Sequence, residues 1–179
     1  MLDAALLPLH NARVRLRALA PDDAVAFADG SDDPAVQRYG HLPEPAYTPD
    51  SVRAMIERDV RPGMARGDLA VLAIADATTD AFAGSLVIFD VSEKRAEVGF
   101  WVHPHSRGCG VSTAALELAV GFALDSGLQE LTARTLPENV SSQRVLENAR
   151  FTFRGHNVGT TPSGQRTDLW EYSRWLHDE

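Results

Sequence analysis

One stretch in the middle of the chain decides the fold, and it reads Glu97-Val-Gly-Phe-Trp-Val-His-Pro-His-Ser-Arg-Gly-Cys-Gly-Val111. Its first half is an apolar run typical of a buried strand, and its second half is a glycine-containing loop. Beyond the loop, apolar residues stand at positions 111, 114, 115, 118, 119, 122 and 123, which is the spacing of one helix face. The stretch therefore predicts a strand, a short loop and a long helix. We expect this helix to end near Gly127, because glycine suits a left-handed cap.

The loop has the features of an anion-binding site. Gly108 and Gly110 let the backbone approach a ligand closely, and the start of the following helix adds partial positive charge. Arg107 supplies a guanidinium that can bind two phosphate oxygens at once. A pyrophosphate group is therefore the expected ligand.

The residues after the loop disfavour two common classes of nucleotide site. A triphosphate-binding loop has Lys followed by Ser or Thr after its second glycine, whereas Val111-Ser-Thr113 follows Gly110. A dinucleotide fingerprint wants a small residue at position 113 and an early βαβ unit, whereas Thr113 stands in the middle of the chain. Kinase, ATPase and nicotinamide-dependent activities are therefore disfavoured.

The remaining segments predict strands and helices on either side of this stretch. Apolar or alternating runs indicate strands at residues 13–17, 69–74, 82–89, 130–136, 151–158 and 167–175. Cap residues indicate helices that begin near Asp22 or Asp23, at Thr48 and near Ser141. Residues 29–49 contain four prolines and are too interrupted to be regular throughout. This order of elements predicts a mixed sheet with helices on both faces, in the α/β or α+β class.

The composition is that of an ordinary globular domain. The chain has 179 residues, 44% of them hydrophobic, and a formal net charge of −8, which suits a cationic acceptor better than nucleic acid or an anionic membrane. No apolar run reaches the ~18 to 20 residues of a membrane-spanning helix, and the N-terminus does not resemble a signal peptide. Its one cysteine, Cys109, excludes an internal disulfide framework. We expect a single domain over residues 1–179, with its recognisable core at about 13–175, in the cytoplasm.

Two motifs together resemble a known family. The stretch 97–111 is followed about thirty residues later by Asn139-Val-Ser-Ser-Gln-Arg-Val-Leu-Glu-Asn148 and then by Phe151. This combination resembles the GNAT superfamily of N-acetyltransferases, and within it the RimJ/RimL type that acetylates N-terminal alanines of ribosomal proteins. The resemblance is closest over residues 96–153. It implies a mostly antiparallel central sheet in which the strand from Glu97 to His103 splays from its neighbour.

The resemblance also implies acetyl-coenzyme A as co-substrate, without a metal. The loop would bind the pyrophosphate of the coenzyme, Asn139 would face the pantetheine arm, and Ser142 would lie near the thioester sulfur. Both residues could instead serve only as a turn and a helix cap. The expected coenzyme-binding residues are Val102, His103, Arg107, Gly108, Cys109, Gly110, Val111, Ser112, Asn139 and Ser142.

Acetyl transfer needs a proton acceptor for the amine, a proton donor for the thiolate and donors for the developing oxyanion. We expect Glu97 to be the general base, through a water molecule, although it could be only a solvated strand residue. Ser142 is the expected donor to the thiolate. The chain departs from the family at two positions, with Leu146 where many members have a Tyr acid, and Arg150 where Gly is usual. The second departure predicts a displaced helix end, capped by Asn148.

Two further groups of residues have simpler interpretations. His103 and His105 resemble half of a metal site, but the sequence offers no third ligand nearby, so we expect no metal. An acidic cluster at positions 22, 23, 29, 32 and 33 is typical of caps and solvated faces, with an added role in attracting a cationic substrate as the alternative.

The leading function is acetyl transfer to a primary amine, which is a protein N-terminus or a small molecule. A homodimer is compatible with this function, and neither nucleic acid nor membrane is expected as a partner. The alternatives are transfer of a longer acyl group from its coenzyme A thioester, and a coenzyme A-binding regulatory domain without catalysis.

Overall fold

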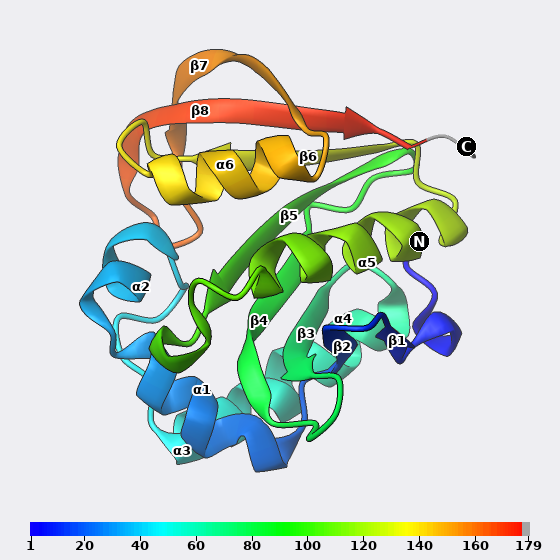
Figure 1. Ribbon diagram of the computed structural model, residues 1–179, viewed down its shortest axis with the longest axis vertical. Helices are drawn as coiled ribbons and strands as arrows, with labels where there is room; N and C mark the ends of the chain where they lie inside the picture. Colours follow the sequence, from blue (N-terminus) through cyan, green and yellow to red (C-terminus); the bar gives the residue numbers. More distant parts are fainter. Residues whose placement is uncertain (177–179) are drawn as a thin grey trace.

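The computed structural model describes residues 1–176, which form one eight-stranded sheet with helices on both faces (Figure 1). Across the sheet the strands follow the order β1-β2-β3-β4-β5-β6-β8-β7. Their bounds are Leu9–His10 (β1), Val14–Ala18 (β2), Ala70–Asp76 (β3), Phe82–Phe89 (β4), Arg95–Val102 (β5), Glu130–Thr135 (β6), Thr152–Thr160 (β7) and Arg166–Trp175 (β8). Neighbouring strands of this described sheet are antiparallel, except that β5 and β6 are parallel.

The parallel pair is short, and this is what opens the sheet. β5 and β6 pair only from Arg95 opposite Glu130 to Glu97 opposite Thr132. β5 continues to Val102 alongside β4, whereas β6 continues to Thr135 alongside β8. Beyond Glu97 the two strands therefore separate, and Figure 1 shows β5 diverging from β6. The mostly antiparallel, splayed sheet that the family resemblance implied is confirmed.

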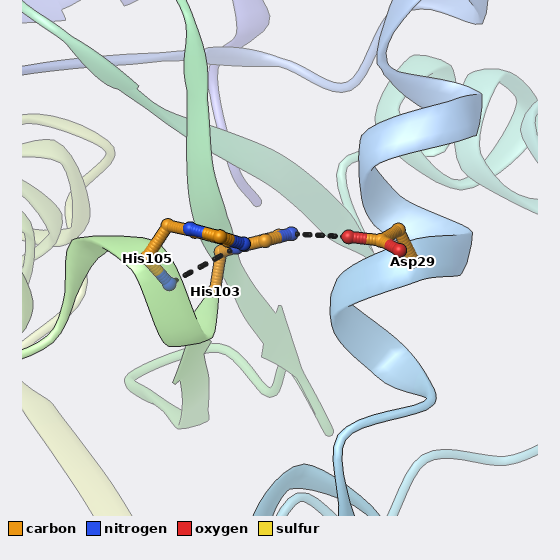
Figure 2. Close-up of side chains that lie close together, drawn as sticks. All are labelled: Asp29, His103 and His105. Carbon is orange, nitrogen blue, oxygen red and sulfur yellow. Dashed lines mark hydrogen bonds and ion pairs between the residues drawn. The ribbon is translucent and has the colours of Figure 1, made fainter.

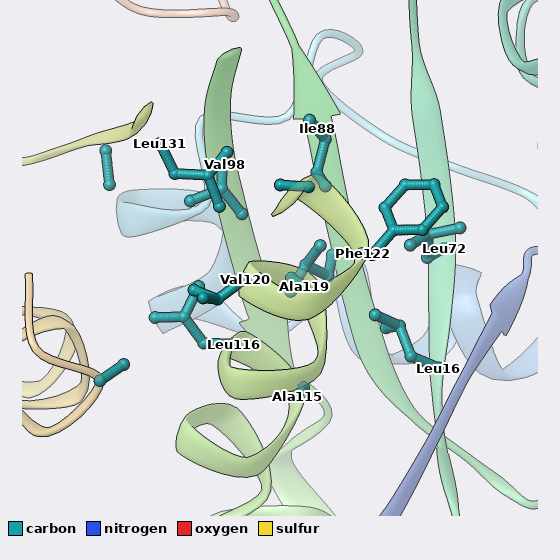
Figure 3. Close-up of a cluster of buried hydrophobic side chains, with 14 of the residues drawn as sticks. Leu16, Leu72, Ile88, Val98, Ala115, Leu116, Ala119, Val120, Phe122 and Leu131 are labelled. Carbon is teal, nitrogen blue, oxygen red and sulfur yellow. The ribbon is translucent and has the colours of Figure 1, made fainter. Parts of the chain in front are cut away.

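Helices cover both faces of the sheet. The described helices are α1 (Ala24–Ser31), α2 (Pro34–Tyr39), α3 (Pro49–Met55), α4 (Arg61–Arg66), α5 (Val111–Asp125) and α6 (Val140–Asn148). α5 and α6 pack on one face, where the larger hydrophobic core joins α5 to strands β2 to β6 (Figure 3). α1, α2 and α3 pack on the other face around Phe27, Val52 and Trp101. Because strand side chains alternate, Ala96 and Val98 of β5 face α5, whereas Glu97, Gly99 and Trp101 face α1.

The local signals explain why the helices begin where they do. Gly110, with φ of 71°, directly precedes α5, and Gly127, with φ of 86°, follows its end as expected. Thr48 and Ser51 form a reciprocal capping box before α3. This helix continues past Asp59 through a π-helical turn, Ile56–Val60, into α4. The sequence also did not indicate the short strand β1 or the separate helix α2.

The end of α6 differs from expectation. Arg150 adopts the left-handed conformation itself, with φ of 61°, while its N–H donates to the carbonyl of Glu147 and that of Phe151 to the carbonyl of Leu146. These two bonds make a Schellman motif, which usually has glycine at the position of Arg150. The expectation of a displaced end capped by Asn148 is therefore wrong. The two terminal bonds hold a non-glycine residue in a conformation that costs about 1 kcal/mol.

None of the helices within residues 1–176 has the length and apolar character that crossing a bilayer would need.

Candidate active site

The separation of β5 from β6 contributes to a cavity of about 370 Å³. We call it the central cavity. Four residues singled out from the sequence line it: Glu97, Asn139, Ser142 and Leu146. They come from β5, from the start of α6 and from its last turn, so the tertiary structure brings both motifs to one space. A cavity of this size is within the range of small-molecule sites.

Glu97 lies at the point where the strands part, and it is paired with a cation. Arg134 of β6 donates through Nε to Glu97 Oε1 at 2.8 Å and through a terminal nitrogen to the carbonyl of Thr160 at 3.0 Å. The Glu97 side chain is 14% exposed. Burial raises the pKa of Glu97, while the hydrogen bond and charge of Arg134 act to lower it. Glu97 is thus a partly buried carboxylate, which excludes the solvated-residue interpretation.

Two further polar residues lining the central cavity have buried atoms without a hydrogen-bond partner in the described structure. His41 precedes α3 and has φ of 48°, and its Nε2 is buried and unpaired. Burial, followed by the charge of Arg134, lowers the pKa of His41, so the ring is neutral at neutral pH. Thr135 is 5% exposed, and its Oγ1 is unpaired as well. Buried polar atoms normally have partners, so both are suited to contact a bound molecule.

Asn139 and Ser142 are bonded to each other at the start of α6. The Asn139 side-chain oxygen accepts from the Ser142 N–H at 3.2 Å, and its Nδ2 donates to Ser142 Oγ at 2.9 Å. Asn139 is therefore the N-cap of α6. The hydroxyl of Ser142 accepts this bond, which leaves its own proton free to donate. Leu146, one turn further along, is fully buried where a Tyr acid would stand in many relatives.

The glycine loop has the backbone geometry expected of it. Gly108 and Gly110 have φ of 76° and 71°. A Cβ at Gly108 would meet nothing within 4 Å, so the loop is open to solvent there. Arg13 of the chain segment before β2 donates to the carbonyl of Cys109 and so ties the loop to β2.

Arg107 points to Asp33 in this structure. Its guanidinium donates to the Asp33 carboxylate, which at the same time caps α2 by accepting from the N–H groups of Ala35 and Val36. The hydrogen bond from Arg107 lowers the pKa of Asp33. The Arg107 side chain remains 44% exposed, so it is accessible to a ligand.

His103 and His105 do have a third neighbour, contrary to the sequence-based expectation. Figure 2 shows His103, at the end of β5, pointing to Asp29 of α1, with His105 beside it. His103 Nε2 lies 3.0 Å from Asp29 Oδ2, and the His105 N–H donates to His103 Nδ1 at 3.3 Å. One potential ligand atom from each of the three residues lies within 4.8 Å of the others. Because Nδ1 accepts a hydrogen bond, the neutral ring carries its proton on Nε2 and donates it to Asp29.

The expected site residues thus divide into two groups. Glu97, Asn139 and Ser142 line the central cavity, while none of the expected residues from 102 to 112 does. This second group lies at the end of β5, in the loop and at the start of α5, and comprises Val102, His103, Arg107, Gly108, Cys109, Gly110, Val111 and Ser112. A long ligand that reaches from the loop to the cavity would touch both groups.

Three residues of the site escaped the sequence analysis: Arg134, His41 and Thr135. The sequence indicated a strand over residues 130–136, but only the pairing of β6 beside β5 shows that Arg134 meets Glu97. His41 lies in the proline-rich segment, which carried no interpretable signal. A His one residue after a glycine, before a run of prolines, is too common to single out.

Comparison with known proteins agrees with this geometry. The family model described as "Acetyltransferase (GNAT) domain" matches residues 13–152. The chain therefore belongs to the GNAT acetyltransferase family. Its reaction is the transfer of an acetyl group from acetyl-CoA to an amine, as the sequence resemblance implied.

Solved structures of this fold are similar over nearly the whole chain. Ribosomal-protein-S5-alanine acetyltransferase from Vibrio fischeri superposes with a TM-score of 0.81 at 15% identity, covering 96% of this chain and 98% of that one. Mycobacterium smegmatis RimJ, in complex with CoA-disulfide, gives 0.79 at 22% identity, covering 90% and 81%. Spermidine N-acetyltransferase from Vibrio cholerae, in complex with CoA and spermine, gives 0.77 at 17% identity, covering 93% and 97%. At these identities the similarity shows the fold.

Proposed function

We propose that the chain acetylates a primary amine in the central cavity, with Glu97 as the proton acceptor and the glycine loop holding the diphosphate of acetyl-CoA. The observation that carries the proposal is the buried carboxylate of Glu97 where β5 leaves β6. At that point the parallel ladder ends, and backbone groups of the two strands become free to bind the acyl carbonyl and the pantetheine arm.

The loop supports binding of the diphosphate by its own residues. Gly108 and Gly110 have left-handed backbones, and α5 begins at Val111, so N–H groups at the helix start can reach an anion. In this proposal, the Arg107 guanidinium leaves the Asp33 carboxylate and binds phosphate oxygens instead. The other contacts to the coenzyme come from the end of β5, from the loop and from the first turn of α5. They are made by Val102, His103, Cys109, Val111 and Ser112.

Proton transfer is assigned to residues of the central cavity. Burial raises the pKa of Glu97, and this residue accepts the proton of the ammonium group directly or through water. The amine nitrogen then bonds to the acyl carbon, and the bond from that carbon to sulfur breaks. The nitrogen loses its second proton, which replaces the one that Ser142 gives up. Ser142 gives a proton to the departing thiolate, while Asn139 holds the Ser142 hydroxyl at 2.9 Å. Leu146 can only exclude water at this position.

The acceptor is a small-molecule amine or a protein N-terminus, and it enters from the face that carries α1, α2 and α3. Tyr39, Tyr47 and Trp101 line the cavity on this side. The loop side is then left to the coenzyme, which permits direct transfer between two bound substrates. We propose that the whole chain acts as one catalytic domain.

Thiol release from acetyl-CoA in the presence of an amine tests the proposal. We expect Glu97→Gln to lower kcat by about 100-fold or more, as loss of a general base does, with the Kd for coenzyme A unchanged. Glu93→Gln is the matched control, because Glu93 stands four residues before Glu97, precedes β5 and is exposed. Full turnover of Glu97→Gln at neutral pH would remove Glu97 as the base.

The same assay separates acyl donors. Acetyl-CoA should be used faster than succinyl-CoA, because the central cavity must hold both the acyl group and the acceptor. A higher kcat/KM with succinyl-CoA would reassign the chain to longer acyl groups.

A further inference from the structure

The acceptor side of the central cavity is aromatic. Phe27 of α1 packs edge-on against Tyr47 and Trp101, with ring centroids 5.3 and 5.1 Å apart. We call these three residues the aromatic wall. All three line the cavity, and Phe27 and Trp101 are 3% and 8% exposed. Such a wall favours an apolar or aromatic group, since burying it removes apolar surface from water.

The carboxylates of the cavity are already neutralised. In the described structure three of them line it: Glu44, Asp59 and Glu97. Arg58 pairs with Glu44 at 3.2 Å and with Asp59 at 2.7 Å. Arg134 pairs with Glu97 at 2.8 Å. A second ammonium group in this cavity would meet two guanidiniums and no unpaired carboxylate, so its desolvation would be poorly compensated.

The acidic cluster around α1 does not supply the missing negative charge. None of its five carboxylates lines the central cavity. Asp23 is paired with Arg17 and Asp33 with Arg107, while Asp29 accepts a hydrogen bond from His103. These carboxylates cap helices and join elements of the structure. The overall charge of −8 therefore does not indicate a polycationic acceptor.

Two polar groups of the cavity have no hydrogen-bond partner in the described structure, and the imidazole of His41 is the one that bears on the acceptor. His41 Nε2 is buried, lines the central cavity and has no partner in the described structure. Burial and then the charge of Arg134 lower the pKa of His41 and keep the ring neutral, although the charge of Glu138 acts to raise that pKa. A neutral imidazole can bind a neutral polar group, such as a carbonyl, without requiring a second charge on the acceptor.

We propose that the acceptor carries a single positive charge, an apolar or aromatic substituent that packs on the aromatic wall, and a neutral polar group that His41 binds. Amides of apolar amino acids have this chemistry, whereas polyamines do not. This inference rests on the proposed function, because it concerns the acceptor of the same reaction.

Matched amino acid amides test whether the acceptor carries only one positive charge. Thiol release from acetyl-CoA is measured with leucinamide, phenylalaninamide, lysinamide and spermidine. We expect kcat/KM for leucinamide and phenylalaninamide to exceed that for lysinamide and spermidine by about tenfold or more, the usual worth of a mismatch in an apolar pocket. Equal or faster turnover of lysinamide or spermidine would overturn the inference.

A variant at the cavity tests whether the paired carboxylates cause the preference for a singly charged acceptor. Arg58→Gln leaves Glu44 and Asp59 unpaired, and we expect it to raise kcat/KM for lysinamide about three- to tenfold relative to leucinamide. Arg53→Gln is the control, since Arg53 of α3 likewise pairs with a carboxylate, that of Asp50, but does not line the cavity. An equal change in both variants would contradict the charge argument.

His41→Gly tests the polar contact, since glycine accepts a φ of 48° without strain. We expect kcat/KM to fall about tenfold for phenylalaninamide, the worth of one hydrogen bond, and to stay unchanged for 2-phenylethylamine, which has no carbonyl. An equal fall for both amines would remove His41 from acceptor binding. If acetyl-CoA binds but no amine releases thiol, the proposed function itself fails, and a wrong order among active amines refutes only this inference.

Discussion

The two ends of the proposed substrate path are built in different ways. The glycine loop is a local structure, because residues 107–112 are contiguous and include the start of α5. The acceptor end is assembled from α1, the segment around His41 and Tyr47, and strands β5 and β6, which are far apart in the sequence. A contiguous motif can be recognised from its own residues, whereas a site assembled from several segments depends on how the strands pair. Five predictions test this difference, beginning with the largest expected effect.

Arg107→Ala should weaken coenzyme A binding by about 1 to 3 kcal/mol, the worth of a charge-assisted hydrogen bond. Titration calorimetry measures this directly. Arg66→Ala is the matched control, because Arg66 is also an exposed arginine paired with one carboxylate, Asp68, on a different part of the surface. Unchanged affinity in Arg107→Ala would show that the loop binds the coenzyme by its backbone alone.

Arg134→Gln should make acetyl transfer more sensitive to acid. Arg134 acts to lower the pKa of Glu97, so its loss raises that pKa further. The carboxylate, which is the form that accepts a proton, is then reached only at higher pH. We expect the acid limb of kcat/KM to move to higher pH, with about a tenfold loss at pH 6 and an unchanged Kd for coenzyme A.

The same pair has a consequence for stability. Because burial raises the pKa of Glu97, its contribution to stability is present below the ordinary glutamate pKa and is lost as the pH rises through the raised value. In denaturant titrations, Arg134→Gln should enlarge this loss of stability, while Arg134→Lys, which keeps the charge, should restore most of the lost stability.

The kinetic prediction for Arg134→Gln has its own contrary outcome. If the acid limb of kcat/KM does not move in this variant, Glu97 is not the group that accepts the proton.

Asp33→Asn should strengthen coenzyme binding slightly. The substitution frees Arg107 from its carboxylate partner, while asparagine still caps α2. Since ion pairs at the surface contribute about 0 to 1 kcal/mol, we expect a gain of up to about fivefold in affinity. Weaker binding would mean that Asp33 positions Arg107 for the phosphates.

Thr135→Val should leave the free energy of unfolding nearly unchanged, within about 0.5 kcal/mol, because the Thr135 hydroxyl has no partner to lose. Ser85→Ala is the control, since the Ser85 hydroxyl is also buried but donates to the Leu72 carbonyl at 3.0 Å. That loss should cost about 1 kcal/mol. A large destabilisation by Thr135→Val in chemical denaturation would indicate a structural role for the hydroxyl.

Much of the fold could be predicted because the relevant signals are local. The apolar spacing of α5, Gly110 before it and Gly127 after it specify a helix whatever surrounds it. Arg150 shows where local reasoning fails. Its side chain disfavours a left-handed cap, yet the two Schellman bonds at the end of α6 impose that conformation. A preference of about 1 kcal/mol is smaller than the packing of a buried helix end.

By itself, the sequence determined seven of the eight described strands, the long helix, the anion-binding loop and the family, since each depends on residues that are neighbours along the chain. Only the tertiary structure decided that β8 lies between β6 and β7, that Arg134 meets Glu97, and that Asp29 joins the two histidines. These contacts bring together residues 37 and 74 positions apart. Their energy depends on distance in space, for which spacing in the sequence carries no signal.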